Sequence, residues 1–223
     1  MPFFKTDNKL INFYHIPKCA GTTIENSIIK SGLKLSFLDN NFNRYSWTKS
    51  SPQHIIYSEQ KKLFDEDFFD YEFAIVRNPV DRFISAYNHH RRKIGRFSRL
   101  DNFLKNLHTN VQRKNDYFGI EFDNHFVPAS RFISPKTDIF YLENGMQNIL
   151  DELSRKIGYR IVEAQKSNIG NYQQISRHKK NLIIQKIRRR LIKPSPRVSD
   201  LKDHQIEIIK NIYQEDFVLF KLK

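Results

Sequence analysis

Two strand–turn–helix units, at residues 10–29 and 71–93, constrain the fold of this chain more than any other feature. In each unit an apolar, β-prone run leads through a short turn into a helical pattern. Parallel strands connected through helices place their carboxyl ends at one edge of a sheet, where ligands bind. The sequence therefore predicts an α/β fold, in which a short central parallel sheet is flanked by helices in a P-loop-like arrangement of three layers.

The turn of the first unit, Pro17-Lys-Cys-Ala-Gly-Thr-Thr23, has the composition of an anion-binding loop. The helix that follows begins with N–H groups that lack partners and with the positive end of its dipole, and both attract an anion. Gly21 allows the backbone to approach an oxyanion, Lys18 adds a cation, and Thr22 and Thr23 add hydroxyl donors. A bound phosphate is the first expectation.

The loop differs from the nucleoside-triphosphatase pattern G-x-x-x-x-G-K-[ST], because its lysine precedes its glycine. No later apolar strand ends in an obvious magnesium-binding aspartate, which disfavours metal-dependent hydrolysis of a triphosphate. In the second unit the strand ends at Arg77, whose forked guanidinium suits a phosphate. Asn78 is expected to cap the next helix, with Pro79 at its first position and Asp81 three residues beyond the cap.

The rest of the chain predicts five helices and one strand within a single domain of residues 1–223. Gly32 is expected to end the helix of the first unit, and Gly158 to end a later one. Residues 33–54 are interpreted as a polar loop with one short strand, and residues 124–133 as an irregular loop. The further helices are expected at residues 58–64, 98–107, 146–157, 177–192 and 199–213, and the strand at residues 138–142.

Composition narrows the class of protein. Lys and Arg number 38 against 24 for Asp and Glu, a net charge of +14 that predicts attraction to polyanions. The single cysteine, Cys19, excludes an intrachain disulfide and a cysteine-built zinc site. We find no segment that resembles a signal peptide and no apolar run near the roughly 20 residues of a membrane span, so we expect a cytoplasmic protein.

Two motifs resemble those of sulfotransferases that use 3′-phosphoadenosine 5′-phosphosulfate (PAPS). The segment His15-Ile-Pro-Lys-Cys-Ala-Gly-Thr-Thr23 is similar to their 5′-phosphosulfate loop, and Phe73-Ala-Ile-Val-Arg-Asn-Pro-Val-Asp-Arg-Phe-Ile-Ser-Ala-Tyr87 to their 3′-phosphate motif. Two weaker segments resemble later landmarks of the carbohydrate group that includes heparan sulfate 2-O-sulfotransferase. They are Asp138-Ile-Phe-Tyr-Leu-Glu143 and Ile212-Tyr-Gln-Glu-Asp-Phe-Val-Leu-Phe220.

The resemblance implies transfer of a sulfuryl group from PAPS to a hydroxyl, with a saccharide as the expected acceptor and no metal. Lys18 would be catalytic, because its charge would support the departing phosphate. Arg77 and Ser85 would hold the 3′-phosphate. The remaining residues implied to bind the donor are Lys18, Cys19, Ala20, Gly21, Thr22 and Thr23.

A base is needed for the acceptor hydroxyl, and histidine is the usual choice near neutral pH. His54 lies between the two motifs, where this family often carries its catalytic histidine, and is the first candidate. His125 is the second, as base or substrate contact, and Glu25 is the third. His15, within the first strand, is interpreted as a satisfied core residue, and Cys19 as a small loop residue.

Several alternatives stay open from the sequence. His89 and His90, with Arg91 and Arg92, form either a solvated helix face or a patch for an acidic substrate. The charge alone would also suit a polyanion- or nucleic-acid-binding protein. Because the basic residues are spread through several segments and no nucleic-acid motif is apparent, we expect no nucleic-acid partner. The second alternative is a small-molecule kinase with a degenerate P-loop.

Overall fold

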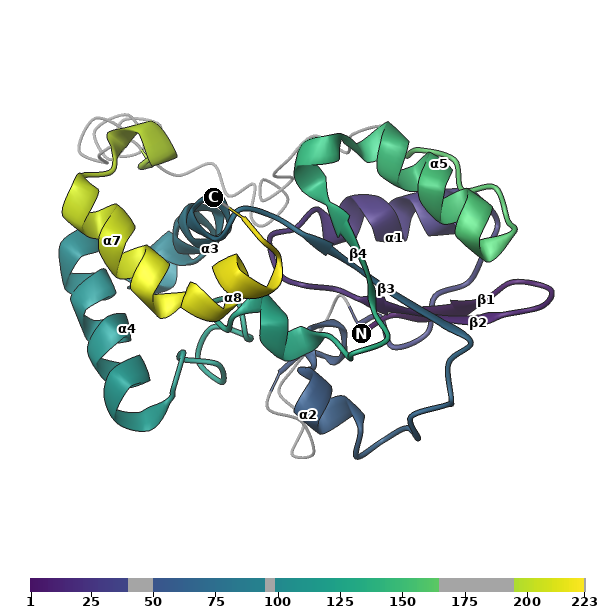
Figure 1. Ribbon diagram of the computed structural model, residues 1–223, viewed down its shortest axis with the longest axis horizontal. Helices are drawn as coiled ribbons and strands as arrows, with labels where there is room; N and C mark the ends of the chain where they lie inside the picture. The colour runs from purple at the N-terminus through teal and green to yellow at the C-terminus, as the bar shows by residue number, and fades with distance from the viewer. Residues whose placement is uncertain (40–49, 95–98, 165–194, 223) are drawn as a thin grey trace, which may run out of the picture.

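The predicted α/β fold is confirmed by a computed structural model, which describes residues 1–39, 50–94, 99–164 and 195–222 (Figure 1). Four strands form one sheet in the order β1-β2-β3-β4. Strands β2, β3 and β4 are parallel, and β1 pairs antiparallel with β2 at the edge. The strands are β1 Phe3–Lys5, β2 Leu10–Tyr14, β3 Tyr71–Val76 and β4 Asp138–Tyr141.

Helices cover the sheet and form a second group beside it. In Figure 1, α1 and α5 lie together on one side of the sheet and α2 lies on the other, while α3, α4, α7 and α8 form the group at the left. Within that group α7 packs against both α3 and α4. The helices are α1 Gly21–Lys30, α2 Tyr57–Gln60, α3 Pro79–Ile94, α4 Leu100–Lys114, α5 Met146–Ile157, α7 Asp203–Ile212 and α8 Gln214–Leu219.

Short 3₁₀ turns connect these elements, at Pro52–His54 (η1), Ala129–Phe132 (η2), Leu142–Asn144 (η3) and Val198–Asp200 (η4). Strands β2 and β3 are buried along nearly their whole length, as expected of parallel strands that are covered on both faces. No helix in the described ranges has both the length and the apolar character needed to cross a lipid bilayer.

Most predicted elements are confirmed, with changes at their ends. The apolar residues of α5 are buried at helical spacing, and Gly32 and Gly158 have the positive φ of helix-ending glycines. The helix expected at residues 58–64 is only α2 followed by turns, and the one expected to end at residue 107 continues to Lys114. The helix expected at residues 199–213 is shorter than predicted, because α7 begins at Asp203 and ends at Ile212, and α8 follows beyond the predicted end.

The edge strand β1 is absent from the prediction, because Lys5, Asp7 and Lys9 interrupt the apolar pattern there. The short strand expected in residues 33–54 is reduced, in the described part, to a bridge between Ser36 and Phe3. The basic helix expected at residues 177–192 lies outside the described residues.

Candidate active site

The loop between β2 and α1 has the backbone of an anion-binding turn. Lys18 and Ala20 are left-handed, with φ of 68° and 64°, and α1 begins directly afterwards at Gly21. Left-handed residues in such turns direct successive N–H groups toward one point. The Thr23 N–H donates to the Ala20 carbonyl at 3.0 Å. Within the described residues the N–H groups of Gly21 and Thr22 have no acceptor, so they remain available to an anion.

Two cations lie at the ends of neighbouring strands. Lys18 follows β2, Arg77 follows β3, and these two strands are parallel partners. Burial, and after it the positive charge of Arg77, lower the pKa of Lys18. Arg77 donates from Nη2 to Asp81 Oδ1 at 3.1 Å. The two predicted donor-binding cations are therefore within electrostatic reach of each other.

Ser85 lies on α3 in register with Arg77. The positions of Arg77, Asp81, Ser85 and His89 are four residues apart, so the last three lie along one side of the helix. The predicted cap is confirmed, because Asn78 Oδ1 accepts a hydrogen bond from the Val80 N–H at 3.0 Å. Ser85 and Arg77 are both half-buried.

Cys19 and Gly21 have packing roles in the loop. Cys19 is buried in the core, and burial raises the pKa of its thiol to about 12, so the thiol stays protonated near neutral pH. A Cβ atom on Gly21 would lie 2.1 Å from His15 Nε2. The glycine is therefore needed so that the His15 ring can pack against the start of α1.

His54 forms a buried pair with Asp123. Its Nδ1 lies 2.7 Å from Asp123 Oδ2, and the Ser51 N–H and hydroxyl donate to the same carboxylate at 2.6 and 2.8 Å. Burial lowers the pKa of His54 to about 4, although the hydrogen bond to Asp123 opposes that shift. Burial raises the pKa of Asp123, but the bonds from His54 and Ser51 outweigh it and the net value is about 2. A neutral imidazole beside an ionised carboxylate results.

His15 and Glu25 form a second pair next to the first. His15 Nδ1 lies 2.5 Å from Glu25 Oε1, and both side chains are buried. The His15 ring is 4.9 Å from the His54 ring, centroid to centroid. The interpretation of His15 as a satisfied histidine agrees with this geometry. Since the Glu25 carboxylate is engaged with His15, Glu25 is a weaker candidate for the base.

His125 lies on the other side of His54, with a centroid separation of 5.0 Å. It is buried, and burial lowers its pKa well below the usual value for histidine. The structure thus brings together His54 and His125, which are 71 positions apart in the sequence. Lys18 is also within electrostatic reach of His125 and contributes to its lowered pKa.

The segment that carries His125 is fixed by the second group of helices. Buried Arg82 of α3 donates to the Val127 carbonyl at 2.8 Å, and its guanidinium lies 3.8 Å from Asp216. Asp216 accepts hydrogen bonds from the N–H groups of Ala129 and Ser130, each at 2.9 Å. The histidine therefore has a rigid support.

Sequence reasoning missed Asp123 and its neighbour Asn124. Both residues are left-handed, with φ of 51° and 59°, and Asn124 donates from Nδ2 to the His54 carbonyl at 2.9 Å. Asp and Asn adopt this conformation more readily than other residues with a Cβ atom. The Asp-Asn pair directly before His125 was the available signal.

A cavity of about 760 Å³ lies between α2 and residues 115–133. It shares Ser50 and Asn124 with the surroundings of His54, because both side chains donate to the His54 carbonyl. In the described part of the chain, none of the predicted donor-binding residues lines it. The donor loop and this cavity are separate features.

The site thus combines an anion-binding loop, two cations at adjacent strand ends and a buried histidine–carboxylate pair. Comparison of the chain with curated proteins and with solved structures gave no match. A family model described as "Sulfotransferase family" matches residues 1–223, which is the whole chain. This match was predicted from two segments that resemble sulfotransferase motifs, the loop segment at residues 15–23 and the segment at residues 73–87 that contains Arg77. The chain belongs to the sulfotransferase family.

Proposed function

We propose that this sulfotransferase uses PAPS as its donor and a saccharide hydroxyl as its acceptor. The observation that carries the proposal is the pair of cations Lys18 and Arg77 at the ends of β2 and β3. Arg77 lowers the pKa of Lys18, so the two positive charges repel each other, and an anion bound near both would reduce that repulsion. A donor with phosphate groups at both its 5′ and 3′ positions supplies that negative charge.

The residues present fit such a donor. Gly21 and Thr22 offer backbone N–H groups at the start of α1, and Lys18 lies in the turn before them. Arg77 and Ser85 of α3 would bind the 3′-phosphate. To do so, the Arg77 guanidinium must give up its hydrogen bond to Asp81 and donate to the phosphate instead. When bound, PAPS supplies the sulfuryl group and a phosphate leaving group. Lys18 would stabilise the charge on that phosphate.

His54 is proposed as the base for the acceptor hydroxyl. Asp123 occupies its Nδ1, which leaves Nε2 as the nitrogen that can take a proton. The imidazole is neutral near pH 7, because burial lowers its pKa to about 4. As the proton arrives, the ionised Asp123 carboxylate stabilises the imidazolium. His125 remains the second candidate, and the closeness of the two rings makes it a neighbour of the same acceptor.

The saccharide acceptor is proposed from the resemblance to the carbohydrate group and from the net charge of +14, which favours an anionic glycan. Transfer of labelled sulfate from PAPS to a panel of glycosides, with phenols and tyrosine peptides as comparison, would identify the acceptor class. Labelling of phenols alone would contradict the saccharide assignment and leave the donor assignment intact.

Donor identity is tested by ligand-dependent thermal stability. Adenosine 3′,5′-bisphosphate, the desulfated donor, is expected to raise the melting temperature without magnesium, because a ligand that binds only the folded state stabilises it by mass action. At about 100 times the dissociation constant the gain is about 2.7 kcal/mol. Stabilisation by magnesium-ATP and not by the bisphosphate would support the kinase alternative and overturn the proposal.

Variants locate the binding site. Arg77→Ala and Ser85→Ala should each reduce stabilisation by the bisphosphate, Arg77→Ala more strongly because it removes a charge. Arg113→Ala, on the exposed end of α4, is the matched control and should bind normally. Equal weakening by all three variants would indicate a general charge effect and not a 3′-phosphate site.

A further inference from the structure

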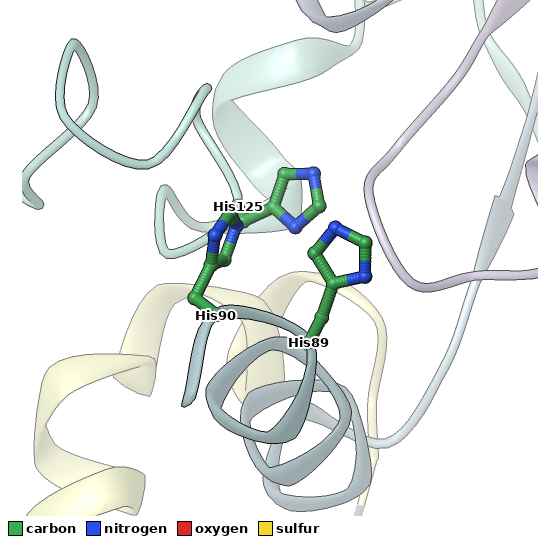
Figure 2. Close-up of side chains that lie close together, drawn as sticks. All are labelled: His89, His90 and His125. Carbon is green, nitrogen blue, oxygen red and sulfur yellow. The ribbon is translucent and has the colours of Figure 1, made fainter. Parts of the chain in front are cut away.

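Three histidines form a cluster at the edge of the proposed active site. His89 and His90 come from α3, and His125 comes from the segment opposite (Figure 2). The His125 ring lies 5.0 Å from the His89 ring and 4.5 Å from the His90 ring, centroid to centroid. In Figure 2 the three rings are turned toward one another. One nitrogen from each residue lies within 4.8 Å of the others.

Two nitrogens of this cluster are buried without a protein partner. Among the described residues, His125 Nδ1 and His90 Nε2 have no hydrogen-bond partner and almost no contact with solvent. A buried polar atom without a partner costs about 1–3 kcal/mol, so such atoms call for an explanation. Two of them in adjoining imidazoles point to a shared ligand.

We propose that His89, His90 and His125 bind one divalent transition-metal ion, for which Zn²⁺ is the expected occupant. Imidazole nitrogen is a preferred ligand of zinc, copper and nickel, whereas magnesium and calcium prefer oxygen. Zinc–nitrogen bonds of about 2.0–2.1 Å require nitrogens about 3.3 Å apart in tetrahedral geometry. The three rings must therefore move together by side-chain rotation, which the exposed position of His89 permits.

The surrounding charges set the strength of the site. Burial lowers the pKa of His90 to about 3 and lowers those of His89 and His125, so the lone pairs are free of protons near neutral pH. Lys18 and Lys93 oppose a cation, since both also lower the pKa of His90, while Asp123 attracts one. The three histidines would fill three of the four positions of a tetrahedral zinc ion. The fourth position would be left to water, as in open zinc sites.

A second set of potential ligands shares His125 with the first. It consists of His54, Asp123 and His125. In that set, however, His54 and Asp123 are already hydrogen-bonded at 2.7 Å, and Asp123 also accepts two bonds from Ser51. A metal there would have to break these bonds, whereas in the first set the buried His125 Nδ1 and His90 Nε2 have no hydrogen-bond partner among the described residues. The first set is therefore favoured, and it does not depend on the proposed donor or acceptor.

The test is zinc binding by the untagged full chain. Equilibrium dialysis against Zn²⁺ near neutral pH, with magnesium in excess, should give one bound zinc per chain. His89→Asn and His90→Gln should each weaken binding by more than the roughly 10–100-fold that loss of an outer-shell partner costs. His204→Gln removes an exposed histidine that contacts Asp101 and should bind zinc normally.

The outcomes separate the two ligand sets. Absence of saturable binding, or equal affinity of His89→Asn and the unaltered chain, would overturn the proposal. Loss of binding in His54→Gln with normal binding in His89→Asn would assign the metal to the second set and overturn it as well. His89 is exposed, so its variant tests the site even if His90→Gln does not fold. Bound Co²⁺ should give the visible absorption of a four-coordinate ion, which is lost in His89→Asn.

Discussion

Asp123 orients His54 from a position 69 residues further along the chain. Replacing it by Asn keeps the shape of the side chain but removes the charge that fixes the imidazole tautomer and stabilises the imidazolium. Asp123→Asn is expected to lower kcat by about 10²–10⁴-fold, the range associated with general-base catalysis. Affinity for adenosine 3′,5′-bisphosphate should stay the same. Steady-state kinetics and calorimetric titration measure the two quantities.

The matched control is Asp67→Asn, a fully exposed carboxylate paired with Lys136, which should leave kcat unchanged. A kcat for Asp123→Asn equal to that of the unaltered enzyme would contradict the proposed role of His54 as the base. A parallel fall in kcat and in bisphosphate affinity would show that Asp123 acts through general folding of the site.

Among the residues of the candidate site, those that lie inside sequence motifs could be predicted. Those that reach the site only through tertiary contacts could not. Lys18 and Arg77 follow apolar strands, so their shared edge of the sheet could be predicted. For Asp123 the Asp-Asn pair signals a left-handed turn, but its contact with His54 could not be predicted, because that contact depends on several left-handed residues, at positions 118, 123 and 124. The sequence predicts that Gly21 lets the backbone approach an oxyanion, and the structure shows that Gly21 also makes room for the His15 ring.

At the scale of elements, α3 and α8 together hold the segment that bears His125. The buried Arg82 guanidinium lies between Asp216 and the carbonyl groups of His125 and Val127. Removing one partner of a buried ion pair leaves a charge without compensation, which costs about 3–5 kcal/mol. Arg82→Met should therefore lower the free energy of unfolding by about this amount, as measured by urea denaturation.

The double variant Arg82→Met, Asp216→Asn should recover part of that loss, because it leaves no charge buried. Arg155→Met, on the exposed side of α5, is the control and should change stability by less than about 0.5 kcal/mol. A loss below about 1 kcal/mol in Arg82→Met would mean that the ion pair is not a main support of the segment.

Elements with local signals were predicted closely. β3 and α3 begin where predicted, because an apolar run, an Asn cap and Pro79 mark their boundaries. α4 extends beyond its predicted end at residue 107, and in the added part the partly buried Val111 packs against the core, while Asn115 supplies the left-handed end. The boundary between α7 and α8 lies at Tyr213, where φ is −110° and ψ is 25°. The hydroxyl of this residue donates to the Phe126 carbonyl at 2.9 Å, a contact with no local signature in the sequence.

At the scale of the whole molecule, buried neutral histidines make stability depend on pH. Burial lowers the pKa of His54 to about 4 and that of His90 to about 3, from 6.5. Below about pH 6.5 the unfolded chain binds protons at these positions and the folded chain does not. The free energy of unfolding should therefore fall as the pH is lowered from 6.5 toward 4, with His54 alone contributing up to about 1.4 kcal/mol per pH unit.

Urea denaturation at several pH values measures this dependence. His54→Gln should reduce the slope between about pH 6.5 and 5, whereas His204→Gln, which removes an exposed histidine, should not. Below the ordinary aspartate pKa of 3.8, Asp123 adds a further loss of stability as the pH falls toward its folded pKa of about 2. A flat profile between pH 6.5 and 5 would contradict the burial of neutral histidines.

The α/β class was predictable from two strand–turn–helix units, but the arrangement of the second group of helices was not. That group is joined by contacts such as the bond from Gln205 Nε2 to Asp101 Oδ1 at 2.6 Å, between residues 104 positions apart. Such pairs leave no periodic pattern in the sequence. Likewise β1 is recognisable as a strand only from its pairing with β2.

The hydrogen bonds that Asp216 accepts from the N–H groups of residues 129 and 130 also set an order of events during synthesis. Asp216 follows Ala129 by 87 positions, and a ribosome adds about 5–20 residues per second. For roughly 4–17 s the histidine segment therefore exists on the nascent chain before its supporting carboxylate has been made. The sheet has all four strands by residue 141, so it can assemble in that interval. The supported geometry around His125 is thus one of the last features to mature, after translation has passed α8.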